Sequence, residues 1–550
     1  MVGRLSWWQE TSIYQIYPRS YMDSNRDGIG DLQGIIGRLD YIKELGFETI
    51  WLSPFFSSPQ GDWGYDVSDY CDVAPEYGRL ADAEELIAEV HGRGMRVLFD
   101  LVMNHSSMEH PWFLESRSSR TDPRRDWYIW RDGRGKRPPN NWQAIPGGPG
   151  WHLDERTGQW YFASFLPFQP DLNYRNPEVK EAMFDVVRFW LDKGVDGFRL
   201  DIFHSIFKDE QFRDNPFSLR YVPAEDMRAG YFQEWKFNLN RPETIELAKE
   251  LRALVDSYSP ERVLLGEIFA DDRTLRRFLG EDEPDGLNLL FSWGLPAFKL
   301  DARFFRRLLA HHERHYPAPY TPVNVLGNHD RKRVVSRVGN DPRKAQALAL
   351  FQFTARGVPV TYYGEEIGMR ESQLPARSAK DPLGQRYSWA PNWLAEFLDL
   401  YLNRDGCRTP MQWDQSENAG FCKAGIDPWL PVPENHRGIN VVTESAADSS
   451  LLSLYRQLLA LRRSSPALLR GDLHPLGEEQ TGRNLLGFRR EHGQESLLVL
   501  INFSNTTGCM QNRSGCDQLL LAVGSDEVLD LDRISLPPYS GLVLANRTNR

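Results

Sequence analysis

The chain has 550 residues, a length that accommodates about two to four domains. Hydrophobic residues make up 41% and charged residues 26%, as in an ordinary globular protein, so the composition excludes wholesale disorder. The formal net charge of −11 argues against nucleic acid and acidic membranes as partners, because both require clustered Lys and Arg. The 12% of aromatic residues suits either a large core or stacking faces for sugar rings and apolar ligands.

Targeting and membrane signals are absent from the sequence pattern. Residues 1–10 contain no apolar run of the length that a secretory signal needs, and no stretch approaches the ~20 apolar residues of a membrane span. The five cysteines show no CxxC or Cys/His metal spacing, so we interpret them as reduced thiols. These features predict a cytoplasmic protein that acts without a membrane or nucleic acid partner.

The first two-thirds of the chain contain eight short apolar runs, most of them followed by a longer helical pattern. The runs are mostly continuous and rich in β-branched or aromatic residues, as in strands buried on both faces of a parallel sheet. Eight strand–helix units predict an α/β fold, a (β/α)8 TIM barrel whose active site lies at the carboxyl ends of the strands; a doubly wound sheet is the alternative. The predicted strands are 12–17, 49–52, 96–102, 197–201, 263–267, 287–291, 323–326 and 358–363, and the predicted helices include 81–91, 178–193, 242–258 and 341–355.

Three connections are too long for simple βα loops, and all three leave the carboxyl ends of predicted strands. Residues 105–172, rich in Pro, Gly, Trp and Arg, predict an inserted subdomain after the third strand. Residues 205–241 and 364–420 form two further excursions over the same face. Short strand-like runs separated by turns predict an all-β sandwich domain over residues 469–550. The catalytic barrel domain would then comprise residues 1–104 and 173–468.

Ionisable residues collect at the ends of four predicted strands. Arg199 and Asp201 lie two residues apart and therefore face the same side of a strand, where the guanidinium would keep the carboxylate ionised. One such acid alone is usually a helix cap or a turn former, and one buried His is usually a core residue. Their joint occurrence favours acid/base chemistry on a neutral ligand. The other members of the set are Asp100, Asn104, His105, Glu267, Asn328, His329 and Asp330.

In combination these segments resemble the α-amylase family of retaining glycoside hydrolases (glycoside hydrolase family 13), and within it the oligo-1,6-glucosidase/α-glucosidase branch. The resemblance implies an exo-acting enzyme that removes terminal α-linked glucose from small α-glucosides and short oligosaccharides, through α-1,6 and/or α-1,4 bonds and a β-glucosyl-enzyme intermediate. A glucosyl transferase or isomerase on the same scaffold is the alternative. We expect a monomer or homodimer. The matching segments are 14–19, 64–66, 100–105, 169–173, 197–201, 267, 328–330 and 404–413.

The resemblance assigns three catalytic carboxyl groups. Asp201 is the expected nucleophile, Glu267 the general acid/base and Asp330 the transition-state stabiliser. A retaining glycosidase needs one carboxylate that attacks the anomeric carbon and one carboxylic acid that protonates the leaving oxygen, so the two must differ in protonation. Arg199 would supply a fixed cation beside Asp201.

The resemblance also implies a −1 subsite, which holds the terminal glucose. Asp66 and Arg404 resemble a pair that closes the far end of this subsite, so that long chains cannot pass through. Ile202, directly after the nucleophile, is expected to shape the wall of the +1 subsite and to favour α-1,6 bonds. The remaining candidates are sugar-binding histidines and possible stacking faces, although the two aromatic rings would equally suit a core: His105, His329, Tyr65 and Phe165.

A loop near the amino terminus is a candidate metal site. It carries oxygen side chains at positions one, three, five and nine, with Gly after the fifth, and so resembles the start of an EF-hand loop without its final Glu. A polar turn held by side chain to backbone hydrogen bonds is the alternative. The branch resemblance implies one structural Ca²⁺, bound by Asp23, Asn25, Asp27, the Ile29 carbonyl and Asp31.

Overall fold

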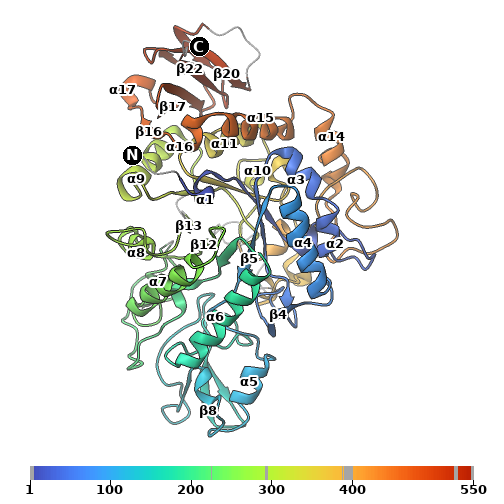
Figure 1. Ribbon diagram of the computed structural model, residues 1–550, viewed down its shortest axis with the longest axis vertical. Coiled ribbons are helices and arrows are strands. Elements are labelled where there is room, and N and C mark those ends of the chain that lie inside the picture. The colour runs from blue at the N-terminus through green and yellow to red at the C-terminus, as the bar shows by residue number, and fades with distance from the viewer. Residues whose placement is uncertain are drawn as a thin grey trace.

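The computed structural model describes residues 5–224, 226–291, 295–386, 388, 401–524 and 530–546. A sheet of eight parallel strands forms its centre (Figure 1). The strands are neighbours in the order β13, β12, β9, β5, β2, β1, β15, β14, and a parallel bridge between Phe291 and Val323 links the two edges. The predicted (β/α)8 barrel is therefore confirmed. Its strands are β1 (Ile13–Ile16), β2 (Thr49–Leu52), β5 (Arg96–Leu101), β9 (Gly197–Leu200), β12 (Val263–Gly266), β13 (Leu289–Leu290), β14 (Val323–Val325) and β15 (Val358–Tyr362).

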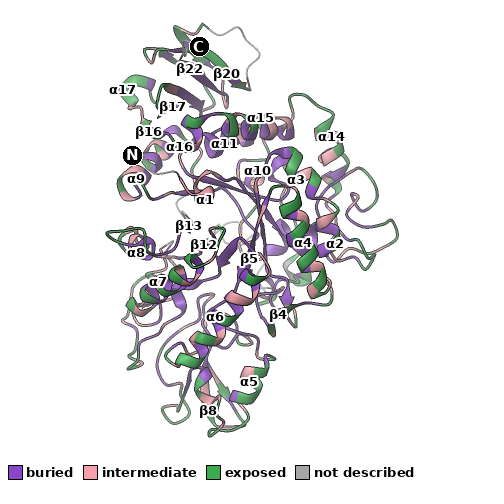
Figure 2. Ribbon diagram, viewed as in Figure 1, coloured by how far each residue is buried: buried purple, intermediate pink, exposed green. Residues whose placement is uncertain are grey.

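Side-chain alternation along the strands places both the core and the polar residues. The barrel interior contains apolar side chains such as Trp51, Leu98 and Leu265, which are fully buried, and Figure 2 shows the central strands buried along their length. Asp100 and Glu267 stand two residues after Leu98 and Leu265, so they face the same side. The same two-residue alternation that places apolar side chains in the barrel interior therefore places carboxyl groups at the carboxyl end of the barrel.

Helices surround the barrel, and short polar side chains fix where several of them begin. The Asn176 side chain accepts the N–H of Glu178 at the start of α6 (Pro177–Asp192), and Asp271 and Asp301 cap α8 (Asp272–Leu279) and α9 (Ala302–His315) in the same manner. The barrel helices are α1 (Trp7–Glu10), α2 (Leu32–Ile36), α3 (Leu39–Leu45), α4 (Leu80–Gly92), α6 (Pro177–Asp192), α7 (Pro242–Asp256), α8 (Asp272–Leu279), α9 (Ala302–His315), α10 (Val334–Arg337) and α11 (Pro342–Thr354).

One predicted amphipathic helix is buried on almost every side. Helix α11 contacts both α15 (Leu451–Ser464) and strand β18 (Glu495–Asn502) of the carboxyl-terminal domain. Residues on successive positions of α11, from Ala347 to Thr354, are all buried. The reason is its place between the barrel and the next domain, which removes the solvent face that an outer barrel helix usually keeps.

The three long excursions follow β5, β9 and β15, as predicted. The first forms a three-stranded antiparallel sheet in the order β6, β8, β7, with α5 (Pro111–Ser116) beside it. The boundaries proposed at 105 and 172 stay predictions. The second contains a two-stranded hairpin, and residues 387 and 389–400 of the third lie outside the described residues. The strands are β3 (Phe56–Ser57) and β4 (Asp69–Val73) after β2, β6 (Trp130–Arg131), β7 (Trp151–Asp154), β8 (Gln159–Phe162), β10 (Ala229–Gly230) and β11 (Gln233–Glu234).

The carboxyl-terminal part is a β-sandwich, which confirms the predicted domain type (Figure 1). A five-stranded sheet in the order β16, β17, β18, β22, β20 faces the pair β19–β21 across buried side chains that include Leu498 and Ile534. Its strands are β16 (Asp472–Pro475), β17 (Leu485–His492), β18, β19 (Gly508–Gln511), β20 (Cys516–Val523), β21 (Arg533–Leu536) and β22 (Gly541–Asn546). The remaining helices are α12 (Pro382–Arg386), α14 (Val441–Ser445), α15, α16 (Pro466–Arg470) and α17 (Glu478–Thr481).

Two further features concern membrane-spanning helices and cysteine residues. Among the described residues, the structure contains no helix with the length and apolar character that crossing a bilayer requires. All five cysteines have free thiols, and three of them, Cys407, Cys422 and Cys516, are buried.

Candidate active site

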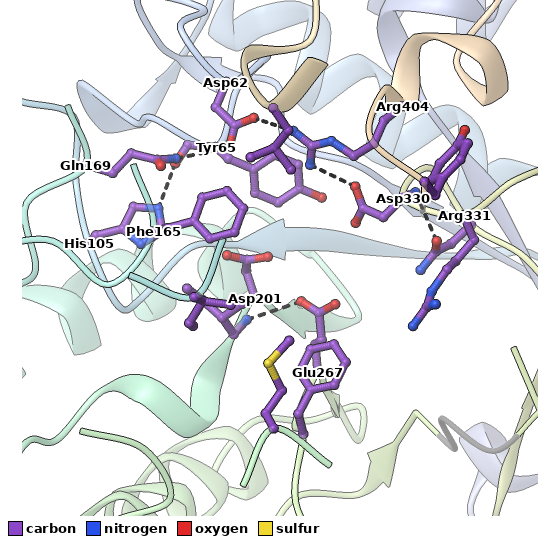
Figure 3. A pocket seen from close by; sticks show the side chains of 17 residues that line it. Asp62, Tyr65, His105, Phe165, Gln169, Asp201, Glu267, Asp330, Arg331 and Arg404 are labelled. Atoms are coloured by element: carbon purple, nitrogen blue, oxygen red, sulfur yellow. Dashed lines mark hydrogen bonds and ion pairs between the residues drawn. The ribbon is translucent and has the colours of Figure 1, made fainter. Parts of the chain in front are cut away.

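A cavity of about 240 Å³ lies at the carboxyl ends of the barrel strands (Figure 3). Strand ends supply its charged floor, and all three excursions supply its walls. Its lining residues are Asp62, Tyr65, His105, Ile145, Phe165, Gln169, Asp201, Ile202, Met227, Glu267, Phe269, Asn328, Asp330, Arg331, Leu383, Tyr401 and Arg404. The structure thus brings the three predicted catalytic acids into one cavity. Predicted residues Arg199, His329 and Asp66 do not line it.

One guanidinium holds three carboxyl groups beneath the cavity. Arg199 Nη1 donates to Asp100 Oδ1 and to Asp201 Oδ1, each at 2.8 Å, and Nη2 donates to Glu267 Oε2 at 2.5 Å. The register of the sheet produces this arrangement, because Asp100 on β5 pairs directly with Arg199 on β9. Arg199 is 1% exposed, so its role is to position the two cavity carboxyls rather than to meet a ligand.

Burial raises the pKa values of two carboxyl groups in this cluster. Burial raises the pKa of Asp201 well above its usual value; Arg199 opposes this effect, and the negative charges of Glu267 and Asp100 add to it. Burial likewise raises the pKa of Asp100 to about 6. One cation, Arg199, faces three buried carboxyl groups and therefore only partly offsets the effect of burial on the pKa values of Asp201 and Asp100.

Asp330 lies in the opposite electrostatic environment. Its Oδ1 accepts hydrogen bonds from Arg404 Nη1 at 2.9 Å and from Arg408 Nη2 at 2.8 Å, and its Oδ2 lies 3.2 Å from His329 Nε2. Burial would raise the pKa of Asp330, but His329, Arg404 and Arg408 together hold it far below the usual range. Asp330 is therefore a permanent anion whose side chain is 31% exposed, the most open of the three acids.

Arg404 lines the cavity, but its carboxylate partners differ from the predicted one. Arg404 Nη2 donates to Asp62 Oδ1 at 2.9 Å and to Asp381 Oδ1 at 2.7 Å, so the predicted pairing with Asp66 is wrong. Burial raises the pKa of Asp62 to about 6, although Arg404 opposes the shift. Gln169 Nε2 also donates to Asp62, at 3.2 Å, and joins the first excursion to this ion pair (Figure 3).

Asp66 stabilises the loop that carries Asp62. Its carboxylate accepts the Ser58 hydroxyl at 3.0 Å and the backbone N–H groups of Gly61 and Asp62 at 2.8 and 2.9 Å. Both acids belong to one short turn, and the sequence spacing alone does not distinguish the acid that faces the cavity from the acid that closes the turn. Its hydrogen bonds therefore make Asp66 a positioning residue.

The predicted histidines and aromatic rings occupy two layers. His105, Tyr65 and Phe165 line the cavity, whereas His329 lies behind Tyr65, with the two rings stacked at 5.6 Å and an interplanar angle of 7°. Tyr65 Oη lies 2.7 Å from His329 Nε2. Burial lowers the pKa of His105 to about 4 and that of His329 to about 3, so both imidazoles are neutral near pH 7.

Ile202 lines the cavity directly after Asp201, the predicted nucleophile, in an unusual backbone conformation. Its φ of 31° lies in the left-handed region, which a β-branched residue seldom adopts. Its N–H donates to Glu267 Oε2 at 3.3 Å. The turn after β9 therefore positions the acid/base candidate through the backbone of Ile202, while the Ile202 side chain forms part of the wall.

Several lining residues were not predicted from the sequence. Asp62 is one of them. Met227 and Tyr401 are two others, and they come from the second and the third long excursion, respectively. Asp62 lies two residues before the matching segment 64–66, so that segment could have pointed to it. No sequence pattern identifies Met227 or Tyr401, because loop residues lack the periodicity that assigns a strand or helix face.

The predicted calcium loop precedes α2 and is folded by its own side chains. Asp23 accepts the N–H groups of Arg26 and Gly28 at 2.6 and 3.0 Å, and Asp27 accepts the N–H of Ile29 at 2.8 Å. Asp31 caps α2 by accepting the N–H of Gly34, and its carboxylate also accepts hydrogen bonds from the backbone N–H and the hydroxyl of Ser24. The loop lies against the third excursion, where Asp23 N–H donates to the Phe421 carbonyl.

Comparisons with known proteins agree with this fold and identify the family. A family model described as the alpha amylase catalytic domain matches residues 15–471. A probable alpha-glucosidase of Rhizobium meliloti (strain 1021) is 41% identical over 514 residues, which cover 91% of this chain and 90% of that protein. An oligo-1,6-glucosidase of Parageobacillus thermoglucosidasius is 36% identical over 570 residues, which cover 98% of each protein.

Solved structures show the same similarity. An alpha-glucosyl transfer enzyme, XgtA, superposes with a TM-score of 0.88 at 36% identity, covering 99% of this chain and 100% of the other. The trehalulose synthase MutB from Pseudomonas mesoacidophila MX-45 superposes with a TM-score of 0.89 at 32% identity, again covering 99% and 100%. The similarity thus spans all of the domains.

Proposed function

Because the chain belongs to the α-amylase family of glycoside hydrolases, with the α-glucosidases and oligo-1,6-glucosidases, we propose that it is a retaining, exo-acting α-glucosidase. Its substrates would be disaccharides and short oligosaccharides with terminal α-linked glucose. One observation carries the proposal: two carboxyls, Asp201 and Glu267, share a single guanidinium at the floor of a cavity that is also lined by the ion pair of Asp62 and Arg404.

The proposed reaction proceeds by double displacement. Asp201 attacks the anomeric carbon while Glu267 donates its proton to the departing glycosidic oxygen, and a β-glucosyl ester forms on Asp201. Glu267 then removes a proton from water, which attacks the ester and releases α-glucose. The cycle requires Asp201 to be ionised and Glu267 to carry the proton that it donates, and Arg199 Nη1 donates a hydrogen bond to the attacking carboxylate.

Asp330 supports the proposal as a fixed anion. Positive charge develops on the sugar ring in an oxocarbenium-like transition state, and an anion already held by Arg404, Arg408 and His329 needs no reorganisation to stabilise it. His105 is neutral near pH 7 and is therefore suited to a hydrogen bond with a sugar hydroxyl. Tyr65 and Phe165 offer ring faces to the glucose.

Product stereochemistry tests the mechanism. Hydrolysis of maltose followed by NMR is expected to show α-glucose as the first product from the non-reducing sugar, before it equilibrates with the β anomer. Maltotriose is expected to yield glucose and maltose from the non-reducing end only. Initial formation of β-glucose, or cleavage of long chains at internal bonds, would reject the proposal.

Glucosyl transfer is a second candidate, favoured by the near full-length similarity to the alpha-glucosyl transfer enzyme XgtA and to a trehalulose synthase. The same glucosyl-enzyme would form, and a sugar hydroxyl instead of water would accept the glucose. With maltose or sucrose at high concentration, the ratio of new oligosaccharides or sucrose isomers to free glucose separates the two functions. A product mixture dominated by transfer would favour this candidate over hydrolysis.

The pH dependence of the reaction follows from the buried acids. We expect kcat/KM to fall as the pH is lowered through about 6, because burial raises the pKa of Asp62 to about 6 and protonation of Asp62 removes the anion that faces Arg404. The raised pKa of Asp201 acts in the same direction, since a protonated nucleophile cannot attack. Initial rates at low substrate concentration, measured as a function of pH, give this acidic side of the kcat/KM profile. Unchanged kcat/KM down to about pH 5, where a free Asp is still ionised, would contradict it.

For linkage preference we propose activity on isomaltose-type α-1,6 bonds, some activity on α-1,4 bonds and little on starch. Ile202 supplies an apolar wall beside the reacting bond and no hydroxyl. Ile202→Thr places a hydroxyl in this apolar wall and is expected to lower the kcat/KM ratio of isomaltose to maltose about tenfold, whereas Ile202→Val removes one methylene but keeps the wall apolar and β-branched and is expected to have a smaller effect. Equal ratios in wild type and Ile202→Thr would show that other residues set the preference.

We also propose that the loop 23–31 binds one structural Ca²⁺. Its donors are carboxylate, amide and carbonyl oxygens, which Ca²⁺ prefers, and an oxygen that accepts an N–H keeps a second lone pair. In the described part of the chain, Asp23, Asp27 and Asp31 do not form a group with ligand atoms within 4.8 Å of one another, so a bound ion has to draw them together. The bound ion would hold the loop in place near the segment that includes Phe421.

Calcium is expected to stabilise the protein without taking part in the chemistry. A ligand that binds only the folded state at a hundred times its Kd stabilises it by about 2.7 kcal/mol. Chelation should therefore lower the Tm of the wild type, and Asp23→Ala should lose this response, as measured by thermal unfolding with and without Ca²⁺. A Tm that does not depend on Ca²⁺ in the wild type would reject the site.

A further inference from the structure

A separate cluster of ionisable side chains lies on the outer helices of the barrel. His311 and His315 are four residues apart near the end of α9, and Asp272 is the first residue of α8 (Figure 1). One ring nitrogen of each His and one carboxylate oxygen of Asp272 all lie within 4.8 Å of one another. Over the described ranges, this is the one group of three or more His, Cys, Asp or Glu side chains with that spacing.

The geometry of the cluster approaches that of a metal site. Residues four apart on a helix share a face, and the rings of His311 and His315 have centroids 4.5 Å apart. His311 Nε2 lies 2.9 Å from Asp272 Oδ1. Tetrahedral Zn²⁺ with bonds of about 2.0–2.1 Å separates its ligand atoms by roughly 3.4 Å, so small side-chain rotations suffice to place an ion between the three.

The surroundings support the same interpretation. Tyr316 Oη donates to Asp272 Oδ1 at 3.3 Å, which orients the carboxylate as outer hydrogen bonds do around metal ligands. The side chains of His311 and Asp272 are 41% and 36% exposed, so an ion has a path from solvent and water can supply a fourth ligand.

A simple ion pair explains only part of the cluster. It accounts for the contact between His311 and Asp272. The side chain of His315 makes no hydrogen bond or ion pair among the described residues, and yet its ring packs against the ring of His311. A donor set of two imidazoles and one carboxylate suits Zn²⁺ and its neighbours among the transition metals, whereas Ca²⁺ and Mg²⁺ prefer oxygen alone. We propose that Asp272, His311 and His315 bind a divalent transition-metal ion of the zinc class, with water completing the coordination.

An ion at this site would link two helices and stabilise the fold. Helix α8 follows β12, the strand that leads to Glu267, and α9 follows β13. The ion would join these two helices on the outside of the barrel, where Tyr316 and Asp272 form an existing direct link. It would therefore raise the stability of this side of the barrel without entering the cavity.

The test uses the full-length protein, stripped by a chelator and supplied with Ca²⁺. Zn²⁺ titrated by calorimetry is expected to bind with one equivalent per chain and to raise the Tm. His315→Ala is expected to weaken Zn²⁺ binding by at least about tenfold. His474→Ala is the matched control, because His474 also faces a carboxylate, Glu491 at 3.7 Å, but has no third donor in the described structure. Co²⁺ in place of Zn²⁺ should give visible absorption that disappears in His315→Ala.

Defined outcomes would overturn the proposal. Zn²⁺ binding of equal strength in the wild type, His315→Ala and Asp272→Asn would place the ion elsewhere on the chain. Absence of saturable Zn²⁺ binding to the wild type would leave only the His311–Asp272 ion pair. The two variants alter partly exposed side chains on different helices, so agreement between them separates loss of the site from a failure to fold.

Discussion

Asp201→Asn is expected to lower kcat by about 10⁴-fold or more, because the amide cannot form the glucosyl ester. The substitution keeps the volume of the side chain and an oxygen that can accept the hydrogen bond from Arg199 Nη1, now 2.8 Å long. The fold should therefore survive. An aryl α-glucoside with a good leaving group is the best substrate for this measurement. The aryl group departs with little acid assistance, so the decrease in kcat reports the loss of nucleophilic attack alone.

Glu267→Gln distinguishes the two carboxyl roles. With the same aryl glucoside, this variant should form the intermediate but hydrolyse it slowly, and azide should restore turnover by attacking the ester without a general base. Azide should not restore Asp201→Asn. If Asp201→Asn kept wild-type rates, or if azide rescued it and failed to rescue Glu267→Gln, the assigned roles would be wrong.

Asp196→Asn is a matched control at the opposite end of the same strand. Asp196 precedes β9 at the end of the barrel opposite the cavity, where its carboxylate lies 2.8 Å from His91 Nε2 and 3.1 Å from Arg96 Nη1. Its loss should lower the Tm and leave kcat near the wild-type value at temperatures where the variant is folded. A large loss of kcat in this control would show that effects at β9 are not specific to the reacting groups.

The second large effect is expected at the ion pair of Asp62 and Arg404. Asp62→Asn is expected to lower kcat/KM by about 10²- to 10³-fold, because breaking a buried ion pair from one side typically costs 3–5 kcal/mol. Arg404 would lose one of its three carboxylates while remaining bound to Asp381 and Asp330. Since Arg404 also holds Asp330, its displacement would weaken the transition-state anion together with the binding of glucose.

Asp66→Asn separates the two acids of this turn. Asp66 accepts hydrogen bonds from the loop and does not line the cavity, so its substitution should reduce the Tm and cause a smaller loss of kcat/KM than Asp62→Asn. Kinetics on maltose and isomaltose below the lowest Tm, with circular dichroism as the control for folding, compare the two. A larger kinetic loss in Asp66→Asn would restore Asp66 as the residue that closes the subsite.

Periodicity explains how far the sequence could predict the barrel. Buried parallel strands are continuous apolar runs, and all eight were placed because this pattern is local. The candidate acids Asp201 and Glu267 follow from the same pattern, since each is the residue directly after a barrel strand, and Asp330 lies in the loop that leaves the same end of β14. Helix α11 shows the limit, because its burial depends on a domain that lies a hundred residues further along the chain.

The sequence by itself determined the barrel, the domain types and the strand-end residues that approach one another, because each depends on side chains at a regular spacing. Tertiary structure decided which of Asp62 and Asp66 faces Arg404, why His329 lies behind Tyr65, and which residues of the excursions reach the cavity. It alone brought His311 and His315 to Asp272. These contacts join separate turns, loops and helices, and their geometry is set by the packing of the whole chain rather than by any local pattern.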